Sequence, residues 1–156
     1  MKIVAAVNLL ILCLVASAAP VRIGTFEVDA TPPVGSPLAY DPLTGSDAPL
    51  SCRGVVLLGA GDPIVLAAID WIGLSNDGHL EFRRALAKGA ATRIERVTMH
   101  ALHQHDAPRC DFSADALLAE HGMGGKKFNV AHAREVIASV TSAVKGAVET
   151  AEPVSH

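Results

Sequence analysis

Three of the seven histidines in the chain fall within six residues, at His100, His103 and His105, and Asp106 follows directly. In extended backbone, the side chains of His103 and His105 leave the same face of a strand, and His100 is directed to the other face. Two imidazoles on one face can share a metal ion, and zinc binds histidine nitrogen at about 2.0–2.1 Å. The carboxylate of Asp106 could bind a metal, orient an imidazole or shift its pKa. The spacing therefore predicts part of a metal site; the alternative is a pair of histidines hydrogen-bonded at a strand end.

The segments on either side of this motif predict where it lies in the fold. Arg93–Leu102 is typical of a strand that leads into the histidines, and the apolar run Ile64–Ile69 is typical of a strand buried on both faces. Between them, Asn76–Lys88 predicts a helix that Gly89 ends. A strand, a helix and a strand in this order predict a right-handed crossover between parallel neighbours. Asp70 would then share one sheet edge with the histidines; alternatively, it caps a loop or the helix.

Two further features complete the predicted fold. Cys52–Leu58 is expected to pair with Ile64–Ile69 as a hairpin, because a glycine-rich loop joins them. Val130–Ala151 predicts a long helix, because its apolar side chains recur at spacings of three and four and Asn129 can cap it. The remaining predicted elements are a strand at Val21–Thr31, proline-rich loops at 31–37 and 40–50, and a short helix at Ser113–His121. The expected fold class is α/β, a mixed sheet with a hairpin and a parallel βαβ crossover, and helices packed on its faces.

The first residues are typical of an export signal. Lys2 precedes the apolar run Ile3–Val15, and Ala16–Ala18 fits a small-x-small cleavage pattern. The alternative is an uncleaved anchor, although the run is shorter than the roughly 20 residues of a membrane-spanning helix. Removal of residues 1–18 would leave 19–156 as one domain with no transmembrane segment, and would change the net charge from −3 to −4. We therefore expect a secreted or periplasmic protein, and the mild acidity argues against nucleic acid as a partner.

Two cysteines, Cys52 and Cys110, would remain after cleavage. In an exported protein such a pair permits one disulfide. Free buried thiols are the alternative, because the sequence does not fix the distance between the two side chains.

Three segments resemble one known family. Val28–Leu38, with the sequence VDATPPVGSPL, resembles an opening motif Asp-Ile-Thr-Pro-Pro-x-Gly-x-Pro-Leu. Val55–Leu58 and Val65–Asp70 resemble a strand pair that ends in aspartate, and His103–Pro108 falls where the family has Thr-His-Thr-His-Ser-Gly-Pro. In this order and spacing, roughly residues 22–156 resemble the amino-terminal domain of the neutral/alkaline (non-lysosomal) ceramidase family.

The resemblance implies a chemistry for the histidine motif. In that family a zinc ion activates water to cleave an amide bond, and the first histidine of the motif is a zinc ligand. His103 is then expected to bind zinc, and His105 and Asp106 to take part in catalysis beside it. The other family ligands (a second histidine, a glutamate and a tyrosine) come later than residue 156, so 19–156 is expected to be an incomplete part of the domain. Asp106 replaces a serine and Arg109 follows the motif, which favours a substrate more polar than a long-chain ceramide.

The sequence thus predicts an exported zinc-dependent hydrolase of the ceramidase-like family. Its substrate would be a small-molecule or lipid-like N-acyl amide, and this chain would have part of the metal site and no activity alone. A catalytic zinc site uses three protein ligands, more than the two histidines supply. The alternatives are a secreted non-catalytic binding module or an inactive fragment. A barrel-type amidohydrolase fits less well, since such barrels take about 250 residues.

Overall fold

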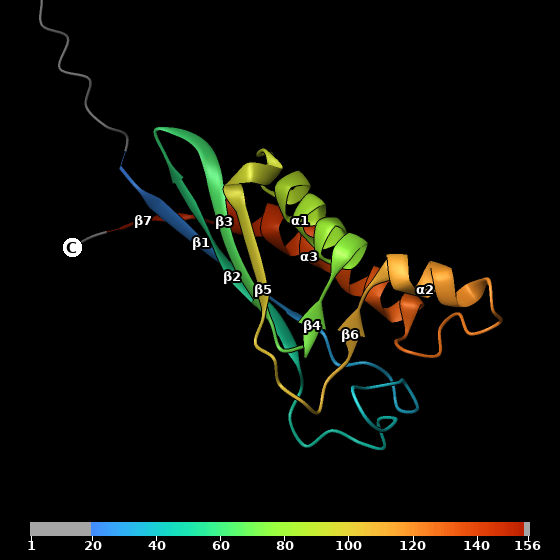
Figure 1. Cartoon of the computed structure of the whole chain (residues 1–156). Helices are drawn as coiled ribbons and strands as arrows, with labels where there is room; N and C mark the ends of the chain where they lie inside the picture. Colours follow the sequence, from blue (N-terminus) through green and yellow to red (C-terminus); the bar gives the residue numbers. More distant parts are fainter. Residues whose placement is uncertain (1–19, 155–156) are drawn as a thin grey trace, which may run out of the picture.

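A mixed β-sheet forms one layer of the molecule in the computed structural model, which describes residues 20–154 (Figure 1). The strand order in this sheet is β5-β3-β2-β1-β7, and a separate small sheet pairs β4 with β6. The strands are β1 (Arg22–Asp29), β2 (Ser51–Gly59), β3 (Gly61–Ile69), β4 (Gly73–Leu74), β5 (Val97–Ala101), β6 (Arg109–Cys110) and β7 (Glu152–Pro153). The helices are α1 (Asn76–Gly89), α2 (Phe112–Ala119) and α3 (Val130–Glu149), with a 3-10 turn at Ile94–Arg96.

The predicted hairpin and crossover are both present. β2 and β3 pair antiparallel, and β1 pairs antiparallel with β2. From β3 the chain passes through α1 to β5, which pairs parallel with β3 from Val65↔Val97 to Ile69↔Ala101. The α/β fold class with a mixed sheet is therefore confirmed. The predicted strand at 93–102 is shorter than expected, because its first part forms the 3-10 turn and only Val97–Ala101 pairs with β3.

Helices α1 and α3 lie side by side against one face of the sheet (Figure 1). The side chains between the helices and the sheet form the core. Alternate strand residues such as Val56, Val65 and Met99 point into this core. From the helices, Phe82 and Val140 are fully buried against them. The apolar periodicity of the helices and the alternation of the strands thus meet in one hydrophobic layer.

The opposite face of the sheet, which we call the open face, has an apolar middle that is uncovered within residues 20–154. Leu66 in the middle of β3 is 43% exposed, and Ile23 on β1 is 36% exposed. Val55 and Leu57 on β2 are half-buried between them. The expectation that 64–69 is buried on both faces is therefore wrong for the described residues: every second side chain of β3 faces outward.

Two glycines allow α3 to lie close to its neighbours. A Cβ atom on Gly24 of β1 would overlap the carbonyl oxygen of Ala147 in α3. A Cβ on Gly89, the last residue of α1, would lie 2.6 Å from the carbonyl oxygen of Thr141. These contacts leave no room for a side chain, so glycine sets the distance between α3, the sheet and α1.

The sequence predicts that Gly89 ends α1, but the residue in the left-handed conformation at the end of this helix is Ala91. Ala91, two residues beyond Gly89, has a positive φ of 50°, in the left-handed region. Its N–H donates to the carbonyl of Lys88, and the N–H of Thr92 donates to that of Ala87. This pattern is a Schellman motif, in which the residue at the left-handed position is usually glycine.

Cys52 and Cys110 are free and buried, so of the two alternatives the structure has separate thiols. The export signal predicted at 1–18 lies outside the described residues. No helix within residues 20–154 is both long and apolar enough to span a bilayer.

Candidate metal and substrate site

The predicted histidines lie just beyond the parallel pair β3 and β5, where both strands end. The N–H of Leu102 donates to the carbonyl of Ile69 (2.9 Å), and the N–H of His103 donates to that of Trp71 (3.2 Å). His103 has a φ of 63°, so the chain turns sharply at this residue. The motif is therefore a turn and not the expected extended strand end, because β5 stops at Ala101.

The side chain of His103 is held by a backbone carbonyl. Its Nδ1 lies 2.8 Å from the carbonyl oxygen of Ile72, in the segment between β3 and β4. A carbonyl oxygen only accepts, so Nδ1 must carry the proton. In the neutral ring, Nε2 then has a free lone pair. A histidine that donates from one nitrogen to a carbonyl and presents the other is the usual form of a metal ligand in proteins.

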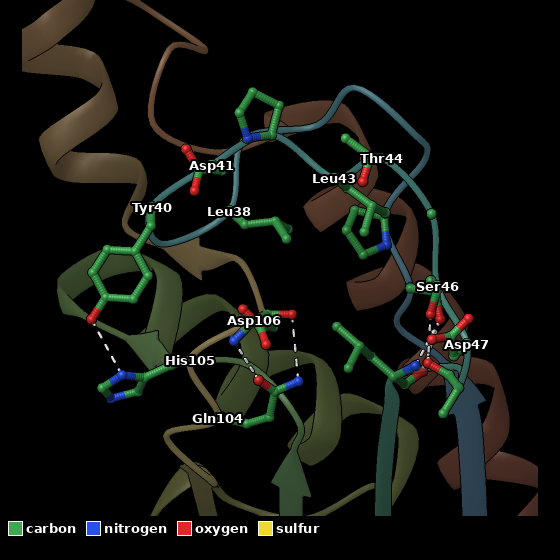
Figure 2. Close-up of a pocket in the computed structure, with 16 residues that line it drawn as sticks. Leu38, Tyr40, Asp41, Leu43, Thr44, Ser46, Asp47, Gln104, His105 and Asp106 are labelled. Atoms are coloured by element: carbon green, nitrogen blue, oxygen red, sulfur yellow. Dashed lines mark hydrogen bonds between the residues drawn. The ribbon is translucent and has the colours of Figure 1, made fainter.

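His105 contacts His103 and is also held by a tyrosine. The two imidazole centroids are 4.9 Å apart, in an edge-to-face arrangement. On the other side, Nδ1 of His105 lies 3.2 Å from the hydroxyl of Tyr40 (Figure 2). Tyr40 reaches this position because the N–H of the preceding Ala39 donates to the carbonyl of Ala107. The two predicted site histidines are thus neighbours.

Asp106 and His105 line a pocket of about 410 Å³ under the loop that joins β1 to β2 (Figure 2). The side-chain oxygen of Gln104 accepts from the N–H of Asp106, which closes the turn that follows the histidines. Two further carboxylates, Asp41 and Asp47, line the same pocket, so its wall is acidic.

His103 opens instead into a second pocket, of about 420 Å³, between the β4–β6 pair and α2. Arg109 and Lys127 line this pocket together with Asp111 and Asp115. Its apolar wall includes Leu118 and Phe128. The three predicted site residues therefore border two pockets of different character, with the contact between the imidazoles at the boundary.

Asp70 does not join the histidines, although β3 and β5 end side by side. Its Oδ2 accepts from the N–H of Ser51 (2.7 Å) and from the hydroxyl of the same residue (2.8 Å). The guanidinium of Arg53 lies 3.6 Å away. The carboxylate binds the residue at which the loop at 40–50 ends and β2 begins, which agrees with the loop cap that was the alternative for this residue.

The described residues do not complete a metal site. Within residues 20–154 no group of three or more His, Cys, Asp or Glu side chains is arranged to hold a metal ion. His103 nonetheless fits the role of one zinc ligand, because its Nε2 is free and its Nδ1 is hydrogen-bonded to a carbonyl. Further ligands would have to come from elsewhere.

Sequence reasoning missed three parts of this site. They are the hydroxyl of Tyr40, the carbonyl of Ile72 and the ammonium of Lys127. Tyr40 stands in a long irregular loop, a place where functional residues are common. The contact of Ile72 comes from the backbone and depends only on the path of the chain, so no residue type could have indicated it.

No family model and no curated protein matches the chain. Among solved structures, the fold is similar to that of the neutral ceramidase from Pseudomonas aeruginosa, with a TM-score of 0.64 and 20% sequence identity. A ceramidase complexed with C2 is also similar, with a TM-score of 0.59 and 17% identity. Each match covers 86% of this chain and 22% of the other chain. The chain thus spans about a fifth of the length of these structures, and the resemblance predicted from the sequence is confirmed at the level of the fold.

Proposed function

We propose, from the fold shared with neutral ceramidase, that this chain belongs to an exported zinc-dependent hydrolase that cleaves an N-acyl amide bond. Residues 19–156 would be the amino-terminal part of its ceramidase-like α/β domain, and His103 one of the zinc ligands. The observation that carries the proposal is the 2.8 Å hydrogen bond from Nδ1 of His103 to the carbonyl of Ile72, which leaves Nε2 free. The other ligands would come from outside residues 20–154. When bound, zinc would supply a nucleophile at neutral pH and polarise the substrate carbonyl.

His105 would move a proton at the site. The Tyr40 hydroxyl, 3.2 Å from Nδ1, can donate to that nitrogen or accept from it. The imidazole can therefore take either tautomer, and Nε2 can give a proton to the leaving amine or take one from water. Tyr40 positions the ring for both steps.

Asp106 would act through charge. Its carboxylate follows His105 in the turn and lines the same pocket, so its negative charge faces the groups that would react there. It would thereby stabilise positive charge that develops at the site during proton transfer.

Export of the protein is part of the proposal. The apolar run and the small-residue cleavage pattern of residues 1–18 support a secreted or periplasmic location. Sequencing the amino terminus of the protein recovered outside the cytoplasm tests this, and a terminus at Ala19 is expected. A protein that keeps Met1 and remains in the cell would contradict it.

Zinc binding by the full chain tests the metal assignment. We expect weak zinc binding, since residues 20–154 hold no group of three ligands, and a decrease in affinity of at least about tenfold in His103→Ala. His100→Ala is the matched control, because His100 is exposed on the open face of the sheet. Calorimetric titration with Zn²⁺ measures both. Equal affinity in His103→Ala and the unmodified chain would contradict the assignment, and no zinc binding at all would favour the inactive fragment.

A further inference from the structure

The pocket beside His103 has a positive side that the proposed function does not use. Arg109 follows the histidine motif on β6, and Lys127 lies in the turn before α3. Both side chains line the pocket of about 420 Å³ into which His103 opens. They also line a smaller adjoining pocket of about 210 Å³, together with Lys126 and one carboxylate, Asp41. Positive charge therefore lies where the two pockets join.

These cations are not neutralised by the described part of the chain. Nη2 of Arg109 donates to the carbonyl of Ala39 at 3.2 Å, which leaves its other N–H groups available. Among residues 20–154, neither Arg109 nor Lys127 forms an ion pair with a carboxylate. Arg134, in contrast, lies 3.1 Å from the carboxylate of Glu81.

The carboxylates in the larger pocket already have structural partners. Oδ1 of Asp111 accepts from the N–H of Ala114 and caps α2, and Oδ2 accepts from the side-chain amide of Asn76 at 2.7 Å. Oδ1 of Asp115 accepts from the N–H of Gly125 at 2.7 Å. These carboxylates hold α2 and the following turn in place, so the two cations are left to face an incoming group.

We propose that the pocket beside His103 binds a substrate oxyanion between Arg109 and Lys127, so that the enzyme hydrolyses N-acyl amides with a carboxylate or a phosphate close to the amide. The hydrolysis in this inference rests on the proposed hydrolase function, whereas the binding of the oxyanion does not. The guanidinium presents paired donors that match either oxyanion, and Lys127 adds a second positive charge. Leu118 and Phe128 on the same pocket wall offer apolar surface to the acyl chain.

The reaction that follows is simple hydrolysis. The amide C–N bond breaks, the hydroxyl of water joins the carbonyl carbon, and a proton goes to the leaving nitrogen. The products are a carboxylic acid and an amine that still bears the oxyanion.

Binding of three probes to the full chain tests the inference. They are N-lauroylglycine with a carboxylate, N-lauroyl-phosphoethanolamine with a phosphate, and N-lauroylethanolamine, which is neutral. Below their micelle concentrations, we expect at least one anionic probe to bind about tenfold or more tighter than the neutral one, and less tightly as salt is raised. The stronger of the two anionic probes identifies the oxyanion.

Three variants and a control locate the binding. Arg109→Gln should lower the affinity for the anionic probe about tenfold, Arg109→Lys less, and Lys127→Gln a few-fold, while the neutral probe is unaffected. Lys88→Gln, at the exposed end of α1, is the control and should change nothing. Circular dichroism checks that each variant is folded.

The inference is overturned if no probe binds, if the neutral probe binds as tightly as both anions, or if the Arg109 and Lys127 variants bind like the unmodified chain. The full-length enzyme, supplied with zinc, is also assayed for hydrolysis. If anions bind through Arg109 but are not hydrolysed, the result supports the oxyanion pocket and contradicts the hydrolase function. The two proposals can therefore fail separately.

Discussion

The backbone of His103 adopts a left-handed conformation that most side chains avoid. Three contacts hold it there: its N–H donates to the carbonyl of Trp71, its Nδ1 donates to the carbonyl of Ile72, and its ring meets that of His105 edge to face. A residue in this region costs free energy and persists where the surroundings fix it, which is common at functional sites. The conformation therefore agrees with the metal role proposed for the side chain.

The buried thiols give a prediction at the same scale. Burial raises the pKa of Cys52 and of Cys110 to about 12, so at pH 8 roughly one thiol in ten thousand is ionised. In a form that begins at Ala19, which contains only these two cysteines, we expect very slow reaction with Ellman's reagent in buffer and complete reaction of both thiols in urea. Ser142→Cys, exposed on α3, should add one thiol that reacts at once. Rapid reaction of Cys52 or Cys110 in the folded chain would contradict the burial.

The meeting of the two imidazoles was predictable from the sequence, but the geometry behind it was not. An i, i+2 spacing puts side chains on one face only in extended backbone. Here the strand ends at Ala101 and the turn at His103 brings the rings together instead. The hydroxyl of Tyr40 comes from 65 positions away in the chain, a contact that local spacing cannot indicate.

At the scale of elements, the end of α1 gives a pair of substitutions with opposite effects. Ala91→Gly should stabilise the fold by about 0.5–1 kcal/mol, because glycine relieves the left-handed strain at some cost in unfolded-chain entropy. Gly89→Ala should destabilise the fold by about 1 kcal/mol. The added Cβ overlaps α3, and the free-energy cost of this overlap exceeds the gain in helix propensity from alanine. Urea unfolding measures both changes in the free energy of unfolding.

Each substitution serves as the control for the other, since both alter a single methyl group within three residues. Destabilisation by Ala91→Gly would mean that the Schellman turn is not formed in solution. A neutral Gly89→Ala would mean that α1 and α3 lie further apart than described.

Elements with strong periodicity were predictable, and their ends were less so. Val130–Glu149 lies within one or two residues of the predicted helix, because its apolar stripe and the cap at Asn129 are both local signals. The start of β5 was misjudged by four residues, since Ile94–Arg96 forms a 3-10 turn that an apolar pattern does not distinguish from a strand. Local patterns define the element; neighbouring elements decide where it stops.

At the scale of the whole molecule, the prediction that differs most from the structure is that β3 is buried on both faces. A run without polar residues predicts cover on both faces, yet Leu66 and its neighbours on the open face are uncovered within residues 20–154. The pattern reports that both faces are apolar, and it cannot report whether a second layer is present.

The open face leads to a prediction about association. Because apolar side chains of β1, β2 and β3 lie together on it, the chain should self-associate at micromolar concentrations. Leu66→Gln should lower the apparent mass measured by light scattering, because it places a polar group in the middle of the face. Leu117→Gln is the control, since Leu117 is 64% exposed but lies on α2, away from the sheet. If both variants associate like the unmodified chain, another surface is responsible.

The single tryptophan of the chain has a consequence for spectroscopy. Trp71 is 1% exposed, its indole N–H donates to the carbonyl of Ala30, and its ring packs edge-on against Phe82. The backbone carbonyl of Trp71 accepts from the N–H of His103, so the residue that carries the fluorophore also holds the histidine turn in place. Tryptophan fluorescence of this protein, excited selectively, therefore comes from one position next to the site, and its emission maximum reports the local order of the histidine turn without any added label.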